Sequence, residues 1–380
     1  MLVAVHAGAG FHSQNRAKES IRACKQACKE AVKSFEQTEN ILNATASAVV
    51  ALEERSMINA FPHLMNLTTQ NDPCTNAGFG SNLSLNGSVS CDSSIVLGTG
   101  ASGAVGNIQG IKNPILVAKA LAIEEMKGSL SLGRVPPIFL VGEGARDWAI
   151  EHNIPYFHPE KLITDESHQA YSTHKALVER KAEKDAHSSS CLYDRLDTVG
   201  AVCVDSSGNV CAATSSGGVL LKSPGRVGQA GVLGCGCWAD ACPEEDISVA
   251  CTTSGVGEHL IKTMLATRLC EAIKHSTATA SVVEATSKCF QTHYQNCEKF
   301  FSLNEPSSKQ AGFLGLQYSA AAGVGEVFWA HSTHSIPIGY MSSRDARPNA
   351  FISFMEKDRT SQVSSEDCRL NISGYCFRLK

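Results

Sequence analysis

Apolar positions follow strand spacing and helix spacing in turn along most of this chain. Residues 3–6 predict a short buried strand, and Gly8 and Gly10 then allow a backbone turn. Helical spacing follows at Ala17, Ile21, Cys24, Cys28, Ala31 and Phe35. A second helical stripe, with Ala44, Ala48 and Leu52, precedes a glycine-rich, strand-like region over residues 76–106. The first hundred residues therefore predict a strand, two helices and more strands.

Further helices and strands are predicted both before and after a polar interruption in the chain. Further helices are predicted from Asn113-Pro114 to Leu121, at 260–273 and at 280–296. Apolar or strand-like segments are predicted at 138–141, 199–204, 210–214, 312–318 and 327–330. Two layers of strands, covered by helices on both outer faces, satisfy this order.

Between about residues 159 and 197 the pattern collapses into charged and polar residues, which predicts a linker. The linker ends at Asp197-Thr198, immediately before a run of small and β-branched residues.

Composition narrows the class of protein. Of the 380 residues 43% are hydrophobic, which is enough for a large core, and the net charge of −4 gives no basic face for nucleic acid. We expect no membrane segment, because no apolar run approaches about 18 residues, and an intracellular protein, because the N-terminus lacks a secretory leader. The sixteen cysteines are scattered through apolar patterns, so we expect reduced core residues.

Thr198 has the chemistry of a nucleophile if the bond before it is cut. A threonine hydroxyl needs a base, and the α-amine of the same residue can serve once it is free. Such an amine has a pKa of about 7.7–8.0, so it can be neutral near physiological pH. The alternative is a linker that enters a strand at a β-favouring residue.

Other polar residues can complete a site around Thr198. Ser216 follows it by 18 residues, on a strand that returns toward it, and Gly217 lets a substrate approach the backbone. Arg226 could bind a carboxylate through two hydrogen bonds, although it could also be a solvated loop charge.

Two further loops are candidates for the same pocket. Ser254 and the Gly255 N–H could stabilise an oxyanion, or could simply begin a helix. The turns at 76–78 and 6–10 could line the pocket or be ordinary turns. The histidines, including His6, His259, His331 and His334, are interpreted as turn or surface residues. Cys235-Gly236-Cys237 has no second ligand pair at zinc-finger spacing, so we expect no metal and no organic cofactor.

Ten short motifs recur in order over nearly the whole chain and resemble the type 2 asparaginase branch of the N-terminal nucleophile hydrolases, and within it the threonine aspartases (taspases). They are HAGAG, TNAGFGSNL, GIKNP, LVGEGA, LDTVGAV, SSGG, PGRVGQA, GCGCWA, TSGVGEHL and the less specific GYMS. The spacing of LDTVGAV, SSGG and PGRVGQ is the most specific part of the resemblance.

The resemblance implies a four-layer αββα sandwich, made as a precursor that cuts itself between Asp197 and Thr198. The resulting α subunit (1–197) and β subunit (198–380) together form one domain. The implied nucleophile is Thr198, with Ser216 as its hydroxyl partner and Ser254-Gly255 as the oxyanion loop. Arg226 is the implied partner of the substrate carboxylate, and Asn76 is the implied active-site asparagine of the α subunit.

One departure separates two enzymatic interpretations. Small-molecule asparaginases carry an aspartate at the position of Gln229, where it holds the α-amine of asparagine or an isoaspartyl dipeptide. Losing that contact would cost about 1.5–3 kcal/mol. A residue inside a polypeptide has no such amine, so we predict a threonine endopeptidase that cleaves after aspartate. The alternatives are an L-asparaginase or isoaspartyl dipeptidase, and a catalytically silent scaffold that binds acidic peptides.

The resemblance also predicts the partners of the protein. They are protein substrates with an aspartate at the cleavage site, which in the family are transcription and chromatin regulators, and a second αβ unit in a homodimer. We therefore expect a nuclear or cytoplasmic location.

Overall fold

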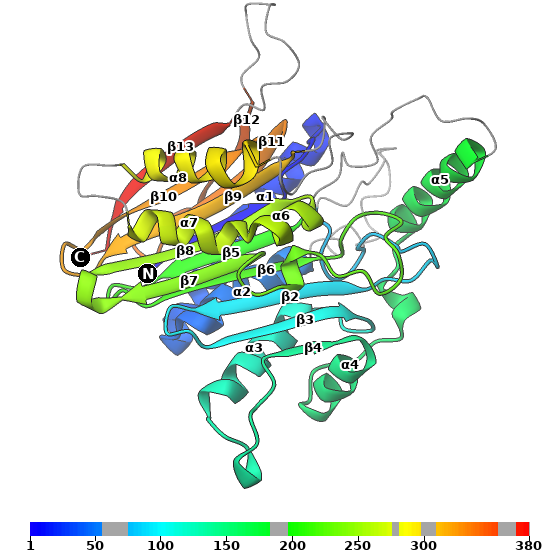
Figure 1. Ribbon diagram of the computed structural model, residues 1–380, viewed down its shortest axis with the longest axis horizontal. Coiled ribbons are helices and arrows are strands. Elements are labelled where there is room, and N and C mark those ends of the chain that lie inside the picture. The colour runs from blue at the N-terminus through cyan, green and yellow to red at the C-terminus, as the bar shows by residue number, and fades with distance from the viewer. Residues whose placement is uncertain (55–74, 183–196, 276–280, 298–308, 356–369, 380) are drawn as a thin grey trace, which may run out of the picture.

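Two β-sheets form the centre of the protein (Figure 1). The computed structural model describes residues 1–54, 75–182, 197–275, 281–297, 309–355 and 370–379. The first sheet has the order β12-β11-β1-β5-β6-β2-β3-β4, and the second has the order β13-β10-β9-β8-β7. The strands of the first sheet are β1 (Leu2–Ala7), β2 (Cys91–Leu97), β3 (Ser102–Ile108), β4 (Phe139–Val141), β5 (Val199–Val204), β6 (Val210–Ser216), β11 (Ser335–Ser342) and β12 (Asn349–Phe354). Those of the second are β7 (Cys237–Cys242), β8 (Ile247–Gly255), β9 (Ala311–Ser319), β10 (Val324–His331) and β13 (Asn371–Arg378).

Strand β5 lies in the interior of the first sheet, antiparallel to both β1 and β6. Its side chains alternate between two cores, as the period of a strand requires. Val199, Ala201 and Cys203 face the helices, whereas Val202 and Val204 pack against the second sheet. Because both faces are buried, the strand contains only small and apolar residues. Thr198, the residue immediately before this strand, is also buried.

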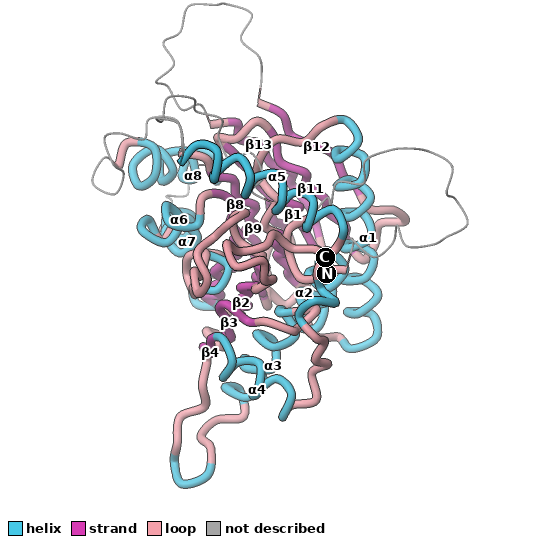
Figure 2. The backbone as a smooth tube through the Cα atoms, turned by 90° about the vertical axis from the view of Figure 1, so that its right-hand side faces the viewer, coloured by secondary structure: helices cyan, strands magenta, loops and turns pink. Residues whose placement is uncertain are grey.

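Helices cover the outer face of each sheet (Figure 2). Helices α1 (Gln14–Thr38), α2 (Ile41–Glu53) and α3 (Pro114–Met126) pack on the first sheet. Helices α7 (Leu265–Lys274) and α8 (Val282–Phe290) pack on the second. The predicted arrangement of helices, two sheets and helices is confirmed. No helix in the described part of the chain is long and apolar enough to cross a membrane.

The structure differs from the predicted elements in several places. The predicted helix at 260–273 is two helices, α6 (Gly257–Thr263) and α7, because Met264 adopts a left-handed conformation with φ 47°. The break turns α7 so that Leu265 and Leu269 are buried while Met264 stays exposed. The first half of the predicted linker forms helix α5 (Asp165–Ala182), and residues 183–196 lie outside the described part.

Several helices and strands were not predicted, whereas the burial of the cysteines was. Strands β7, β8, β11, β12 and β13 and helix α4 (Gly142–Glu151) are absent from the predicted order. The cysteine expectation holds where it can be checked, since ten of the thirteen free cysteines that the structure describes are buried.

A buried carboxyl group, that of Glu53, supports the turn at residues 75–78. Glu53, at the end of α2, is fully buried and accepts hydrogen bonds from Asn113 Nδ2 at 3.1 Å and from Ile115 N at 3.2 Å. Gly78 lies directly against it, with a φ of 65°, and a Cβ at Gly78 would lie 2.5 Å from the Lys112 carbonyl oxygen. Glu53 thus joins α2, the start of α3 and the turn at 75–78.

Replacement of Glu53 by glutamine tests this junction. Burial raises the pKa of Glu53 from 4.5 to about 8. Between these values the folded protein keeps a proton that the unfolded chain releases, so the free energy of unfolding falls as pH rises, at up to about 1.4 kcal/mol per pH unit. In Glu53→Gln this part of the slope should disappear. The measurement is urea unfolding from pH 5 to 9, with Glu54→Gln as the control. An unchanged slope in Glu53→Gln would contradict the assignment.

Candidate active site at the start of β5

The Thr198 hydroxyl lies between two of the residues predicted to surround it. Thr198 is buried, and its Oγ1 donates a hydrogen bond to Ser216 Oγ at 3.0 Å. Gln229 Nε2 donates to Thr198 Oγ1 at 3.3 Å. Ser216 reaches this position because β5 and β6 pair with Val199 opposite Ser215. The hydroxyl is therefore oriented from both sides.

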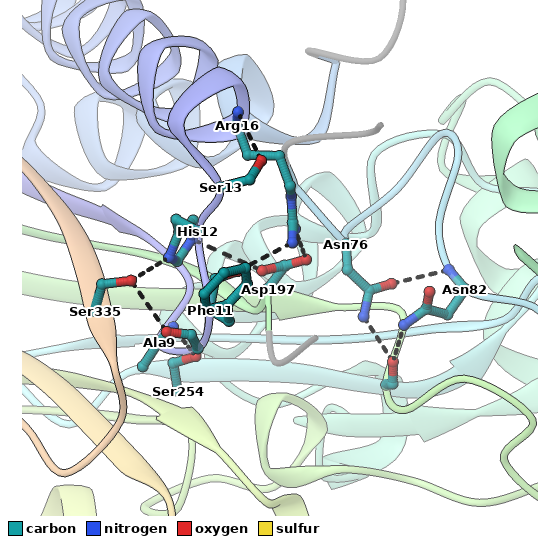
Figure 3. A network of polar contacts seen from close by, with 12 residues as sticks. Ala9, Phe11, His12, Ser13, Arg16, Asn76, Asn82, Asp197, Ser254 and Ser335 are labelled. Carbon is teal, nitrogen blue, oxygen red and sulfur yellow. Dashed lines mark hydrogen bonds and ion pairs between the residues drawn. The ribbon is translucent and has the colours of Figure 1, made fainter. Parts of the chain in front are cut away.

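Asn76 contacts the carbonyl group that precedes Thr198. The backbone N–H of Asn76 donates to the Asp197 carbonyl oxygen at 3.0 Å, so this carbonyl is already polarised. The asparagine is itself fixed, since its carbonyl accepts from Gly217 N at 2.8 Å and its Oδ1 accepts from Asn82 N at 2.9 Å (Figure 3). The structure thus brings Asn76 and Gly217 to the Asp197-Thr198 junction, as the sequence predicts.

Ser254 and Gly255 lie at the end of β8, next to the turn that follows β1. Ser254 is buried, and its Oγ accepts a hydrogen bond from Ala9 N at 2.9 Å. Figure 3 shows this pair beside the residues around Asp197. A Cβ at Gly255 would lie 2.5 Å from the Gln310 carbonyl oxygen, so the backbone there has no room for a side chain. The predicted oxyanion loop and the predicted turn at 6–10 therefore meet.

Arg226 is held by a residue that was not predicted to bind it. Its Nε and Nη2 donate to the two carboxylate oxygens of Glu258, each at 2.8 Å. Burial alone would raise the pKa of Glu258, but the hydrogen bonds and charge of Arg226 outweigh it and leave the pKa below its ordinary value. Arg226, which was predicted to bind the carboxylate of the substrate, thus already binds a carboxylate of its own chain.

Arg16 binds the Asp197 side chain and His12 lies beside it, and neither residue was predicted from the sequence. Arg16 Nη2 donates to Asp197 Oδ2, and both side chains are buried (Figure 3). His12 Nε2 lies 3.9 Å from Asp197 Oδ1, and burial lowers the pKa of His12 to about 4. Ser13 caps α1, so Arg16 lies in the first turn, where a helix disfavours positive charge. A cation at that position is the sequence signal that could have indicated a binding role.

The interpretation of the histidines as turn or surface residues is wrong for three of the four. His6, His259 and His331 are buried. His6 Nε2 lies 3.3 Å from Thr252 Oγ1, and burial lowers the pKa of His6 to about 3, so it stays neutral. Across the described residues, no group of three or more histidine, cysteine, aspartate or glutamate side chains is placed to hold a metal ion.

Comparison with known proteins gives consistent matches. A family model described as "Asparaginase" matches residues 66–304. The chain is 33% identical over 354 residues to "Isoaspartyl peptidase/L-asparaginase" of Bos taurus, covering 93% of this chain and 96% of the relative. It is 36% identical over 267 residues to the protein of the same description in Homo sapiens, covering 70% and 74%. "Isoaspartyl peptidase" of Salmonella typhimurium is 29% identical, with 70% and 76% covered.

The pairing of Arg16 with Asp197 can be tested in a chain kept joined by Thr198→Ala. Arg16→Met should lower the free energy of unfolding by about 3–5 kcal/mol, because it leaves the Asp197 carboxylate buried without its guanidinium. Adding Asp197→Asn should recover much of the loss. Arg22→Met is the control, since that arginine is on the exposed side of α1. Equal effects of the two arginine substitutions in urea unfolding would contradict the pairing.

Proposed function

This chain belongs to the asparaginase family, which consists of N-terminal nucleophile hydrolases, and from the surroundings of Thr198 and Gln229 we propose that it is a threonine endopeptidase that cleaves polypeptides after aspartate. Cleavage of its own Asp197-Thr198 bond would activate it. The nucleophile and the self-cleavage rest on the environment of Thr198, and the choice of substrate rests on one observation, the neutral Gln229 beside the nucleophile.

In the precursor, Thr198 Oγ attacks the Asp197 carbonyl carbon. Ser216 orients the hydroxyl, and the Asn76 N–H stabilises the oxygen that becomes negative. The hydroxyl proton passes to the Thr198 nitrogen, the C–N bond breaks, and an ester joins Asp197 to Thr198 Oγ. Water then hydrolyses the ester, which leaves a carboxylate on Asp197 and a free amine and hydroxyl on Thr198.

The mature protein repeats this chemistry on another chain. The free amine of Thr198 takes the hydroxyl proton, and Oγ attacks the carbonyl of the substrate aspartate. Ser254 and the Gly255 N–H stabilise the oxyanion, and the proton passes to the departing nitrogen. Water cleaves the resulting ester and releases the aspartyl product. Arg226 binds the aspartate side chain, and Arg16, which binds the Asp197 side chain in the precursor, adds a second cation.

The pocket offers little to a free α-ammonium group. Gln229, the side chain that contacts the nucleophile, is neutral. Asp92 is buried and accepts hydrogen bonds from Gly228 N and Asn107 N, each at 2.8 Å. A small amino-acid substrate would bury its ammonium without a dedicated carboxylate, which is unfavourable. A residue within a polypeptide has an uncharged amide at that place.

The second candidate is an isoaspartyl peptidase or L-asparaginase. The relatives carry these descriptions, and this evidence favours the second candidate over the endopeptidase. Both candidates use Thr198 in the same way and differ only in what they bind beside Gln229. Regulators of transcription or chromatin as substrates, and association of two αβ units, stay predictions from the resemblance.

A direct comparison of substrates separates the two candidates. The wild-type protein should cleave a peptide with an internal aspartate and release little ammonia from L-asparagine. Gln229→Asp should raise kcat/KM for L-asparagine and an isoaspartyl dipeptide, relative to the peptide, by about 10–100-fold, because it restores one charge-assisted hydrogen bond. Gln229→Asn, which stays neutral, is the control.

The informative quantity is the ratio of the two activities, since Gln229 also contacts the nucleophile and any substitution there can slow both. A wild-type protein that hydrolyses L-asparagine or the dipeptide but leaves the aspartyl peptide intact would establish the second candidate instead.

A further inference from the structure

The Arg226 guanidinium is held in place by the backbone around it. A Cβ at Gly218 would lie 2.8 Å from Nη1, one at Gly228 would lie 2.9 Å from Nη1, and one at Gly257 would lie 2.6 Å from Nη2. Three segments of chain thus approach the guanidinium closely at glycine positions. The Arg226 side chain is 13% exposed, and this packing surrounds it on the sides that Glu258 does not contact.

Glu258 occupies the edge of the guanidinium that a substrate carboxylate needs. A guanidinium can bind a carboxylate with two parallel hydrogen bonds, through Nε and one Nη or through both Nη atoms. Nη1 lies against Gly218 and Gly228, so the second arrangement is obstructed. The first uses Nε and Nη2, the two atoms that donate to Glu258.

We propose that Glu258 is a specificity-determining residue that competes with the substrate aspartate for Arg226. This inference rests on the proposed role of Arg226 in binding that aspartate. The Glu258 side chain is 52% exposed, so it can leave the guanidinium and be solvated at little cost. An incoming carboxylate replaces it charge for charge, and a neutral side chain, lacking the charge, does not displace it. Glu258 therefore weakens binding of aspartate and rejects asparagine or glutamine at the same place.

The opposite role for Glu258 is to hold Arg226 in position, and the two roles differ in the sign of one effect. If the carboxylate competes, its removal makes Arg226 available and the affinity for acidic ligands rises. If the carboxylate positions Arg226, its removal lets the guanidinium move and the affinity falls. The packing of the three glycines favours competition.

Glu258→Gln tests the inference through two readouts. The first is KM for a peptide with an internal aspartate, and the second is the dissociation constant of N-acetyl-L-aspartate, measured by calorimetry. Each should fall about two- to fivefold, because an exposed ion pair of this kind keeps a corresponding fraction of the protein from binding the ligand through Arg226. The KM of a peptide with asparagine at the same position should not fall to the same extent.

Two further variants locate the effect. Glu143→Gln, which removes a first-turn glutamate 3.7 Å from Arg146 on α4, should change neither readout. Arg226→Ala should abolish binding of N-acetyl-L-aspartate in the presence or absence of Glu258.

Unchanged or raised values in Glu258→Gln would overturn the inference. Tighter binding of N-acetyl-L-aspartate to Glu258→Gln, with no cleavage of the peptide by any variant, would refute the endopeptidase and leave the competition standing. If neither the wild-type protein nor Glu258→Gln binds N-acetyl-L-aspartate, competition for Arg226 is refuted. Cleavage of the peptide would then show that the endopeptidase does not bind its aspartate through Arg226.

Discussion

The hydrogen bond from Thr198 Oγ1 to Ser216 Oγ, 3.0 Å long, is the interaction on which the proposed chemistry depends. It exists because β5 and β6 are adjacent, buried strands whose register is fixed by side chains packed on both faces. A shift of one residue in that register would turn Thr198 away from Ser216. The large core of the protein therefore has a chemical consequence, since it holds a single hydroxyl next to the carbonyl of Asp197.

In the uncut chain, Arg16 and Arg226 are each bound to a carboxylate of the same chain. Arg16 binds Asp197 and Arg226 binds Glu258. The two pairs differ in burial, because Arg16 and Asp197 are both buried, whereas half of Glu258 is exposed. The proposed cleavage would turn Asp197 into a chain end and so change the first pair directly. The second pair has no covalent link to the junction, and in our proposal a substrate carboxylate replaces Glu258 there.

Local sequence patterns predicted those site residues that lie on, or immediately before, strands adjacent both in the sequence and in the sheet. Thr198 and Ser216 follow from two adjacent strands and the turn between them, and Gln229 follows from the resemblance. Arg16 escaped prediction because its partner is 181 residues away, and no local period connects the first turn of α1 with the start of β5. The break at Met264 escaped for a related reason, since the apolar spacing of 260–273 is that of one helix and only packing on β7 and β8 divides it.

The central claim is that breaking the bond before Thr198 creates the group that activates its hydroxyl. The most direct test follows freshly purified wild-type protein as it matures, measuring intact mass and hydrolysis of the preferred aspartyl substrate in the same samples, with Thr198→Ala as the baseline. Activity should rise in proportion to the fraction present as two fragments, one ending at Asp197 and one beginning at Thr198. Full activity in protein whose Asp197-Thr198 bond is intact would contradict the account.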